Sequence, residues 1–217
     1  MGPSEDVRIL RCGASAALVE VADLAAVLRL YHALLVERPR AVRELVPAAR
    51  TVLVAYDPAG TGFDDIATVV NERWEASAGH APEPDQGTDV VEVPVRYDGP
   101  DLAQVAQLTG LDEAEVVRRH TGSEYRSGFC GFAPGFAYLT GLDHGLHVPR
   151  RDDPRTKVPA GAVALADEFT AVYPRESPGG WQLIGHSDVV LWDVERDPPA
   201  LLAPGTPVRF VDVGGGS

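Results

Sequence analysis

The sequence predicts an α+β protein in which a ferredoxin-like N-terminal domain precedes a β-barrel domain. Up to residue 95 the expected elements follow the order β-α-β-β-α-β, the split βαβ arrangement. After residue 120 helical periodicity disappears, and short β-like runs alternate with Gly and Pro turns, as in a closed or folded β domain. Residues 79–88 read GHAPEPDQGT, which is typical of a linker. We therefore predict two domains, at residues 1–80 and 81–217.

Apolar spacing accounts for the elements of the first domain. Apolar side chains that recur at i, i+3 and i+4 predict two amphipathic helices, at residues 22–37 and 64–76. The β-like runs predict strands at residues 7–10, 16–21, 42–46, 51–56 and 90–95. The last of these strands completes the predicted split βαβ order.

Two short helices are predicted next, at residues 101–108 and 113–120. Asp112 is expected to cap the second helix, with Glu115 three residues further on as in a capping box. The pair has the outline of a helix-turn-helix, but acidic residues at its would-be reading end would repel phosphate, which favours a connector. The strands expected after it are residues 163–166, 170–173, 182–184, 189–193 and 208–211.

Composition limits the class of partner. The 217 residues carry a formal net charge of −13, which argues against a nucleic acid or an anionic membrane, because both need a basic face. No run of about 18 apolar residues predicts a membrane span, and charged residues interrupt any signal peptide at the N-terminus. Cys12 and Cys130 give no disulfide framework, so a cytoplasmic protein is expected.

The stretch of residues 129–142, FCGFAPGFAYLTGL, concentrates aromatic residues and glycines. Because Gly and Pro break helices, it predicts a strand, a tight turn at Pro134 and Gly135, and a second strand. Phe132 and Phe136 would then flank a backbone that approaches a ligand closely. The alternative is a core hairpin whose aromatic rings only fill space.

Arg150, Arg151, Arg155 and Lys157 form the densest cationic cluster of this acidic chain, and Lys157 is its only lysine. Such a cluster can hold a carboxylate or a phosphate. The neighbouring aspartates at residues 152 and 153 offer the alternative of a locally neutralised, solvated loop.

The segment SPGGWQ, from Ser177, suggests a loop that brings bare backbone N–H groups to a ligand. Gly179 and Gly180 would permit close approach, Trp181 would offer a ring face, and Gln182 a donor and an acceptor. A hairpin turn with a core tryptophan is the alternative.

His120 and Tyr125 precede the aromatic stretch and are candidate proton carriers, or else a capping histidine and a half-buried phenol. His144 and His147 lack a third ligand at convincing spacing, so no metal is predicted in this chain. The segment GTGFDD at residues 60–65 lacks the Gly-Lys-Ser/Thr end of a phosphate-binding loop.

Taken together, the motifs HTGSEY, GFAPGFAYLTGL, PRRDDPRTKVPAG, TAVYP and SPGGWQLIG resemble those of the family of 5-oxoprolinase B subunits, also described as allophanate hydrolase subunit 1. The resemblance covers roughly residues 91–211. It implies a ferredoxin-like domain followed by a cyclophilin-like β-barrel, and a complex with a related C subunit and a third subunit. Such complexes cleave 5-oxoproline, a cyclic amide, to glutamate at the expense of ATP, which a partner subunit could bind.

The family includes an inhibitor of a sporulation histidine kinase and is related to the carboxyltransferase region of urea carboxylase. A kinase-inhibiting interaction module and an allophanate-type component of urea metabolism are therefore alternative functions. Two departures leave the substrate open: Asp167, Glu168 and Phe169 stand where small residues are usual, and His186 stands where an arginine is usual.

The candidate catalytic residues are His120, Tyr125 and Lys157. The candidate substrate-binding residues are Phe132, Pro134, Gly135, Phe136, Arg150, Arg155, Pro159, Gly161, Ser177, Gly179, Gly180, Trp181, Gln182 and His186. In this hypothesis the cations and backbone donors surround the activated oxygen of the amide.

Overall fold

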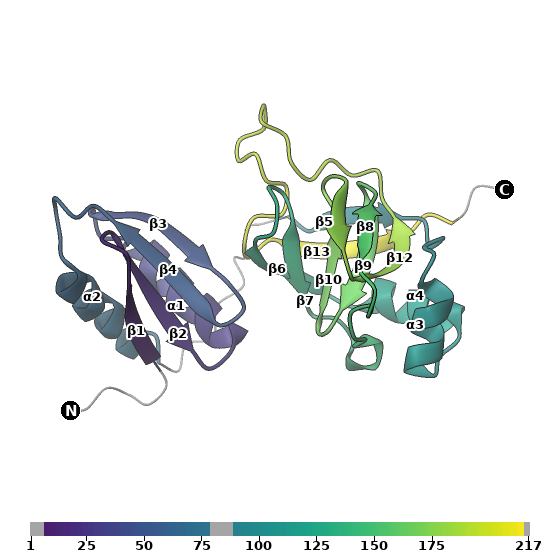
Figure 1. Ribbon diagram of the computed structural model, residues 1–217, viewed down its shortest axis with the longest axis horizontal. Coiled ribbons are helices and arrows are strands. Elements are labelled where there is room, and N and C mark those ends of the chain that lie inside the picture. Colours follow the sequence, from purple (N-terminus) through teal and green to yellow (C-terminus); the bar gives the residue numbers. More distant parts are fainter. Residues whose placement is uncertain (1–6, 79–88, 215–217) are drawn as a thin grey trace. The chain divides into compact units, whose positions relative to one another are not determined.

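The computed structural model describes residues 7–78 and 89–214 (Figure 1). The chain divides into two units, Met1–Gln86 and Gly87–Ser217. The predicted linker, residues 79–88, and the predicted boundary at residues 80 and 81 lie outside the described residues.

The first unit is a four-stranded antiparallel sheet with two helices packed on one face (Figure 1). Its strand order is β1-β2-β4-β3. The elements are β1 (Val7–Cys12), β2 (Ala16–Val21), α1 (Leu24–Val36), β3 (Val42–Pro47), β4 (Thr51–Tyr56) and α2 (Phe63–Ala76). The helices therefore confirm the two predicted from the i, i+3, i+4 spacing.

Alternation places the core of this unit. On β2 and β4 every second residue is buried, so Val19 and Val52 meet the apolar stripes of the helices. Helix α1 begins at its cap, where the Asp23 carboxylate accepts a hydrogen bond of 2.8 Å from the backbone N–H of Ala26.

The predicted β-α-β-β-α-β order was wrong about its last strand. Strand β5 (Val91–Val95) pairs in parallel with β13 (Pro207–Asp212) of the second unit, and β1 takes the edge position beside β2 in the first sheet. Val93 and Val95 are fully buried in the core of the second unit. An alternating run predicts a strand but does not specify which strand lies beside it.

The second unit contains a seven-stranded, nearly closed sheet of order β12-β9-β10-β7-β6-β13-β5. The two edge strands of this sheet, β5 and β12, also approach each other, because Arg96 and His186 exchange two backbone hydrogen bonds of 2.8 Å. The further strands are β6 (Tyr125–Cys130), β7 (Ala137–Thr140), β9 (Ala162–Ala166), β10 (Phe169–Val172) and β12 (Gln182–His186). The predicted β domain is thus confirmed as a barrel-like sheet, but the strand predicted at residues 189–193 was wrong, because only Trp192 there makes an isolated bridge.

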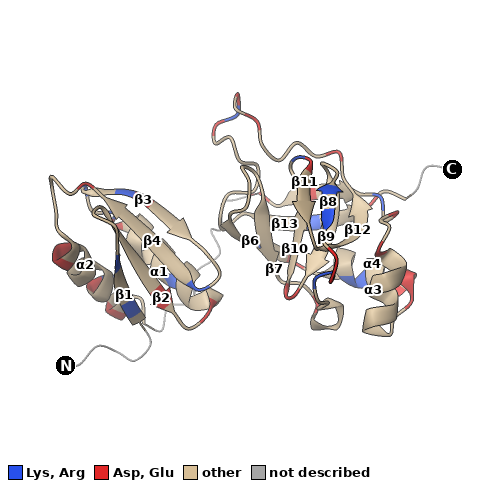
Figure 2. Cartoon of the chain, in the orientation of Figure 1, with Lys and Arg blue, Asp and Glu red and all other residues tan. Residues whose placement is uncertain are grey.

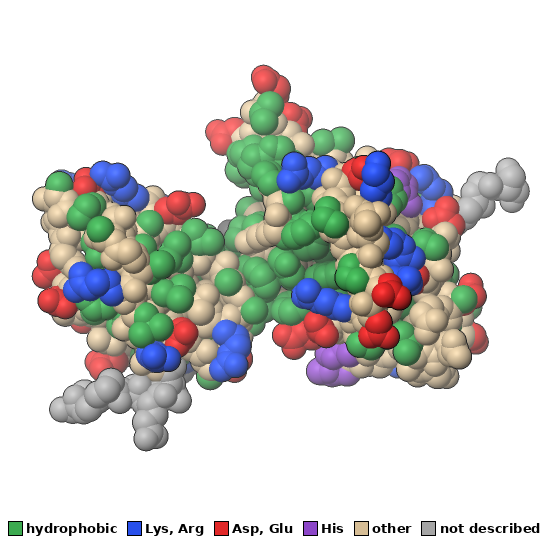
Figure 3. Space-filling view, in the orientation of Figure 1, with side chains coloured by type: hydrophobic (Ala, Val, Ile, Leu, Met, Phe, Trp, Pro, Cys, Tyr) green, Lys and Arg blue, Asp and Glu red, His purple; other side chains and the backbone are tan. Residues whose placement is uncertain are grey.

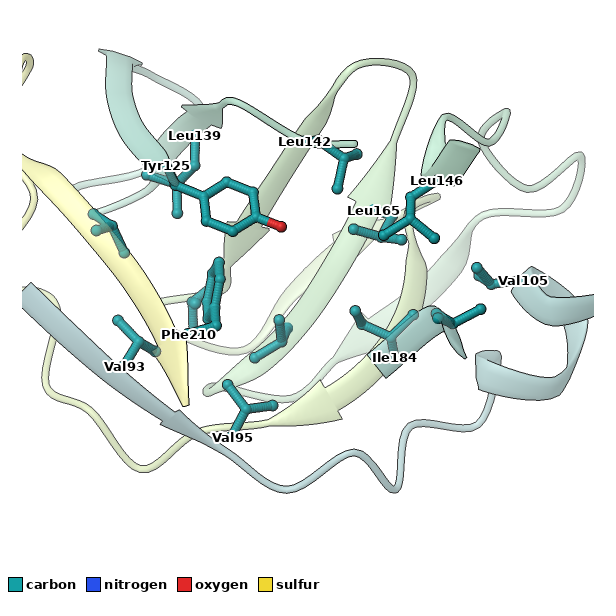
Figure 4. Packing of buried hydrophobic residues seen from close by; sticks show 14 of the residues in the cluster. Val93, Val95, Val105, Tyr125, Leu139, Leu142, Leu146, Leu165, Ile184 and Phe210 are labelled. Carbon is teal, nitrogen blue, oxygen red and sulfur yellow. The ribbon is translucent and has the colours of Figure 1, made fainter. Parts of the chain in front are cut away.

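Inward-pointing side chains fill this barrel (Figure 4). Tyr125 from β6 and Phe210 from β13 pack with their rings 5.1 Å apart, close to Leu139. Helices α3 (Leu102–Thr109) and α4 (Glu113–Gly122) add Val105 and Val116 to the same core. Both were predicted, and Asp112 caps α4 by accepting the Glu115 N–H at 2.7 Å.

A second cluster covers another face of the sheet. Here β8 (Arg155–Val158) and β11 (Ser177–Gly179) form a two-stranded antiparallel ribbon, which we call the β8–β11 ribbon.

The short 3-10 helix η1 (His144–Leu146) lies between β7 and β8 in the chain. None of the described helices is long and apolar enough to cross a membrane.

Candidate functional site

Asp101 organises the cationic cluster. Its carboxylate, only 4% exposed, accepts hydrogen bonds from both terminal nitrogens of Arg155 at 2.8 Å and from Arg151 at 2.9 Å. It also accepts the backbone N–H of Leu183 at 2.7 Å. One carboxylate thus joins the start of α3, the loop before β8, β8 itself and β12.

The Asp101 contacts divide the predicted anion ligands into two kinds. Arg155 and Arg151 share one buried carboxylate, which holds both side chains in place and balances one of their two positive charges. Arg150 is exposed and lies 3.7 Å from Asp167, and Lys157 is 76% exposed and lies 3.2 Å from Glu176. Figure 2 marks the basic residues of β8 in blue. Because exposed ion pairs are weak, Arg150 and Lys157 can exchange these partners for an anion.

A hollow of about 290 Å³ lies beside the cationic loop. Gln182 lines it, and its Nε2 donates to the carbonyl of Pro149 at 3.2 Å, while its Oε1 has no hydrogen-bond partner. The structure therefore brings together the predicted Arg150 and Gln182. The lining residues are Gln104, Leu108, Pro149, Arg150, Arg151, Asp152, Asp153 and Gln182.

Gly179 leaves space for a buried phenol. A Cβ atom at Gly179 would lie 2.3 Å from the hydroxyl oxygen of Tyr173, whereas one at Gly180 would have no neighbour nearer than 3.6 Å. The pKa of Tyr173 is raised to about 12, first by burial and then by Tyr138, while Arg150 and Arg155 oppose the rise. Of the two predicted glycines, only Gly179 is sterically required by this packing.

The predicted pocket walls largely pack against each other. Phe136 is 2% exposed and contacts the rings of Trp181 and Tyr173 at centroid distances of 5.6 and 5.2 Å. Trp181 is itself buried. Phe132 differs, because it is 57% exposed and has a left-handed backbone with φ of 65°. The space-filling alternative therefore describes Phe136 and Trp181. Phe132 contacts the rings of Phe136 and Tyr173 edge-on and remains partly exposed.

The tight turn predicted at Pro134 and Gly135 joins β6 to β7, which pair antiparallel. Gly135 has φ of 80°, and a Cβ atom there would lie 2.8 Å from the Cβ of Trp192. Glycine is needed here both for its left-handed backbone and for this close approach. Pro134 is exposed on the same turn.

His120 and Tyr125 lie in the barrel core. His120 is fully buried, with Nδ1 2.7 Å from the Tyr97 hydroxyl and Nε2 2.9 Å from that of Thr170. Thr170 donates to the carbonyl of Ala164, so it accepts from Nε2–H and leaves Nδ1 to accept from Tyr97. The Tyr125 hydroxyl donates to the His120 carbonyl at 2.8 Å.

Electrostatics agree with a structural role for this pair. Burial lowers the pKa of His120 to about 3 and raises the pKa of Tyr125. The imidazole is therefore neutral near pH 7, with both ring nitrogens already hydrogen-bonded. The alternative of a capping histidine and a half-buried phenol does not describe them either, because the His120 ring binds two hydroxyls and Tyr125 is 3% exposed. Neither side chain lines the hollow beside the cationic loop.

The other predicted residues lie around Gly161, whose backbone packs against His186. Gly161, with φ of 80°, packs so closely that a Cβ atom would lie 2.2 Å from the Ser187 carbonyl oxygen and 2.6 Å from the His186 ring. His186 Nε2 lies 3.1 Å from Asp188, which also binds Arg96 at 2.9 Å. Pro159 is exposed, two residues before Gly161.

Ser177 is bound locally, and the described part of the chain contains no candidate metal centre. The Ser177 hydroxyl donates to the carbonyl of Arg175 at 3.0 Å. Within residues 7–78 and 89–214 no group of three His, Cys, Asp or Glu side chains is placed to hold a metal ion.

Two residues of this region were missed by sequence reasoning. Asp101 stands at the start of a helix, where an aspartate ordinarily predicts a cap, and its arginine partners lie 50 and 54 positions away. Tyr173 stands within the quoted TAVYP motif, but nothing in that motif indicates that its hydroxyl faces Gly179.

Comparison with known proteins identifies the family. Residues 7–202 match the family described as carboxyltransferase domain, subdomain C and D. The chain belongs to this family. A curated relative from Escherichia coli O157:H7, named as the B subunit of 5-oxoprolinase, is 43% identical over 180 residues, which cover 82% of this chain and 80% of the relative.

Solved structures of longer proteins share the fold. TTHA0988 superposes with a TM-score of 0.76 at 35% identity, covering 93% of this chain but only 40% of its own. The urea carboxylase of Kluyveromyces lactis gives 0.71 at 18% identity, covering 95% of this chain and 22% of its own. This chain therefore corresponds to one part of each of these longer proteins.

Proposed function

We propose that this protein is one subunit of a 5-oxoprolinase complex that opens the cyclic amide of 5-oxoproline in an ATP-dependent reaction. The observation that carries the proposal is the similarity to proteins named as B subunits of 5-oxoprolinase, at 38–43% identity in three organisms. The similarity extends over 82% and 78% of the chain in two of them. The family match at residues 7–202 includes the cationic loop and the β8–β11 ribbon.

The chemistry assigns a task to the exposed cations. A lactam resists hydrolysis because its nitrogen is a poor leaving group, and transfer of a phosphoryl group from ATP to the amide oxygen makes the ring carbon electrophilic. Lys157 and Arg150 hold only weak, exposed partners, so they are the ligands we propose for the negative charge of the substrate or of the activated oxygen.

Arg155 takes a different role from the one expected. Its two donors already bind Asp101, so we propose that Arg155 positions the β8–β11 ribbon and leaves the anion to its neighbours. Gly179 and Tyr173 shape the same ribbon from the other side. Gln182, whose Nε2 donates to the Pro149 carbonyl and whose Oε1 is buried without a partner, is proposed to position the cationic loop.

ATP is proposed to bind a partner subunit. The glycine-containing segment at residues 60–65 does not fit a phosphate, because the Asp65 carboxylate accepts the Gly62 N–H at 3.0 Å and Asp64 adds a second negative charge at the start of α2. No step of the reaction is therefore assigned to ATP on this chain. The partners we propose are a related C subunit and a third subunit.

Reconstitution tests the proposal. The purified chain is mixed with the separately purified companion subunits, 5-oxoproline and ATP, and glutamate release is measured. Turnover is expected only in the complete mixture, with omission of this chain and omission of ATP as controls. Hydrolysis by this chain alone, or an undiminished rate without it, would contradict the assignment.

A further inference from the structure

A loop projects from the second unit between β12 and β13, and we call it the arm. We define the arm as residues 190–199, the yellow-green excursion at the top of the second unit in Figure 1. Its base is anchored because Leu191 and Leu202 are each 2% exposed in the barrel core. The Leu201 N–H donates to the Leu191 carbonyl at 2.9 Å, and the Asp193 N–H to that of Pro199 at 3.0 Å.

The arm exposes apolar side chains. Trp192 is 40% exposed and Val194 is 75% exposed, in a segment whose backbone is held by its own hydrogen bonds. The close approach of Gly135 to Trp192 places the turn that carries Phe132 and Pro134 directly against the arm. We call Phe132, Pro134, Trp192 and Val194 the arm patch. Figure 3 shows hydrophobic side chains at the base of the projection, below an acidic tip.

The backbone of Phe132 supports a use for this patch. A bulky residue with φ near +65° is a rare conformation, which costs on the order of 1–3 kcal/mol. The turn is closed by hydrogen bonds from Ala133 to Gly131 at 2.7 Å and from Phe136 to Ala133 at 3.0 Å. One edge of the Phe132 ring contacts Phe136 and Tyr173, and the exposed remainder, on a strained turn of the kind that clusters at functional sites, is available for a partner.

We propose that the arm patch docks this protein onto a companion subunit of its complex, in an apolar groove edged by lysine or arginine. The inference rests on the proposed function and adds the surface through which assembly occurs. Apolar anchors at the centre of a contact, with charged groups at its rim, are the usual anatomy of a stable protein interface.

Charge selects the occupant. Asp193, Glu195 and Asp197 flank the apolar side chains of the arm, against the single cation of Arg196. A basic rim on the companion would complement them, whereas a second copy of this chain would oppose like charges. The net charge of −13 acts in the same direction. In TTHA0988 the matching part shares one polypeptide with further chain, which fits a permanent neighbour.

Substitution of the two arm residues tests the proposal. The double variant Trp192→Ser, Val194→Ser is mixed with the purified companion subunits, and its dissociation constant is measured by calorimetry. We expect it to rise about thirtyfold or more, since aromatic anchors dominate interface energies. Val36→Ser is the matched control, because Val36 is 84% exposed on α1, and its affinity should equal that of wild type.

A second variant and a second readout guard against misfolding. Val194→Asp alters a side chain that is three-quarters exposed, so it should weaken binding with an unchanged melting temperature. Trp74 and Trp181 are 9% and 5% exposed, so Trp192 should give the emission that acrylamide quenches. Acrylamide should reach the Trp192 side chain in the isolated chain, and a bound companion subunit should shield it.

Several outcomes would overturn the proposal. Wild-type affinity in both variants would exclude the patch while leaving an active reconstituted complex, and hence the proposed function, intact. A Trp192 already shielded in the isolated chain would mean that the chain covers its own arm, or that two copies pair if sedimentation shows a dimer. A wild-type chain that neither binds a companion nor supports glutamate release would refute both proposals.

Discussion

Both terminal nitrogens of Arg155 donate to the carboxylate of Asp101, one to each oxygen, at 2.8 Å. The same carboxylate holds Arg151 and the backbone N–H of Leu183. A planar guanidinium matches a carboxylate in this two-point geometry, which a lysine cannot reproduce. The cationic loop is therefore built around a buried anion, and its shape depends on a residue that carries no direct chemistry.

Replacing Asp101 should disorganise this arrangement. Asp101→Asn keeps the size of the side chain but removes the charge and one acceptor oxygen, so two of the four hydrogen bonds are lost and an amide N–H₂ group faces their donors. We expect the free energy of unfolding to fall by about 2–4 kcal/mol, measured in urea. Asp153→Asn, an exposed aspartate of the same loop, should change it by less than about 0.5 kcal/mol. Equal effects of the two changes would refute the organising role.

The variant Lys157→Ala distinguishes a role of this lysine in binding negative charge from a role in folding stability. Its ion pair with Glu176 is exposed on both sides, so its loss should cost less than about 1 kcal/mol in unfolding. If Lys157 stabilises charge that develops in the reaction, turnover of the reconstituted complex should fall roughly a hundredfold to a thousandfold. Lys157→Arg should restore only part of the rate.

Glu176→Gln is the matched control for Lys157. It breaks the same ion pair but leaves the cation in place, so turnover should stay near wild type. An unchanged rate in Lys157→Ala would make this lysine an ordinary surface residue, and equal losses in both variants would make the ion pair, and not the cation, the functional element.

The sequence predicted most helices and strands because their signals are local. The i, i+3, i+4 spacing of α1 and the cap at Asp112 act within a few residues, and the structure contains both. The partner of β5 was predicted wrongly because strand pairing joins residues far apart in the chain, here Val93 and Phe210. Alternation alone contains no information on such a pairing.

The same distinction holds for the site. The PGF turn and the cationic cluster are visible as composition, and the structure contains the turn at Gly135. The sequence does not show which cations of the cluster Asp101 binds, because this depends on a contact between residues 54 positions apart. Likewise, His120 has the residue type of a proton carrier, but its burial is a property of the folded barrel. Residue type suggests chemistry, and only packing decides exposure.

His120 should make stability depend on pH. Its pKa is about 3 in the folded chain and about 6.5 when unfolded, so between these values the unfolded state binds more protons. The free energy of unfolding should therefore fall as pH decreases below 6.5, by up to about 1.4 kcal/mol per pH unit from this residue. Urea unfolding between pH 6.5 and 5 measures the slope.

Substitution of His120 tests its share of the slope. His120→Gln should be less stable at pH 7 and should lose part of the slope. If His120→Gln does not fold, a nuclear magnetic resonance titration of the wild type decides: the His120 ring should stay neutral at pH 5. Protonation of this ring near pH 6.5 would contradict its buried, hydrogen-bonded state.

Gly179→Ala tests how closely the β8–β11 ribbon packs onto Tyr173. The added Cβ would lie 2.3 Å from the phenol oxygen and 3.0 Å from the ring carbon that bears it, so the ring or the ribbon must move. Overpacking of this kind costs about 1–3 kcal/mol of unfolding free energy. Gly180→Ala, with 3.6 Å of clearance, should be tolerated within about 0.5 kcal/mol.

The double variant Gly179→Ala, Tyr173→Phe identifies the atom responsible. Removing the hydroxyl eliminates the nearest clash but leaves the ring carbon, so stability should recover in part. Tyr173→Phe alone provides the reference for the lost hydroxyl. The double variant should be more stable than the sum of the two single losses predicts. Additive losses would mean that Gly179 is required for some property other than its contact with Tyr173. The same variants can be measured in the reconstituted complex. Variants that displace the ribbon should lower turnover, because Lys157 lies on β8, which pairs with β11.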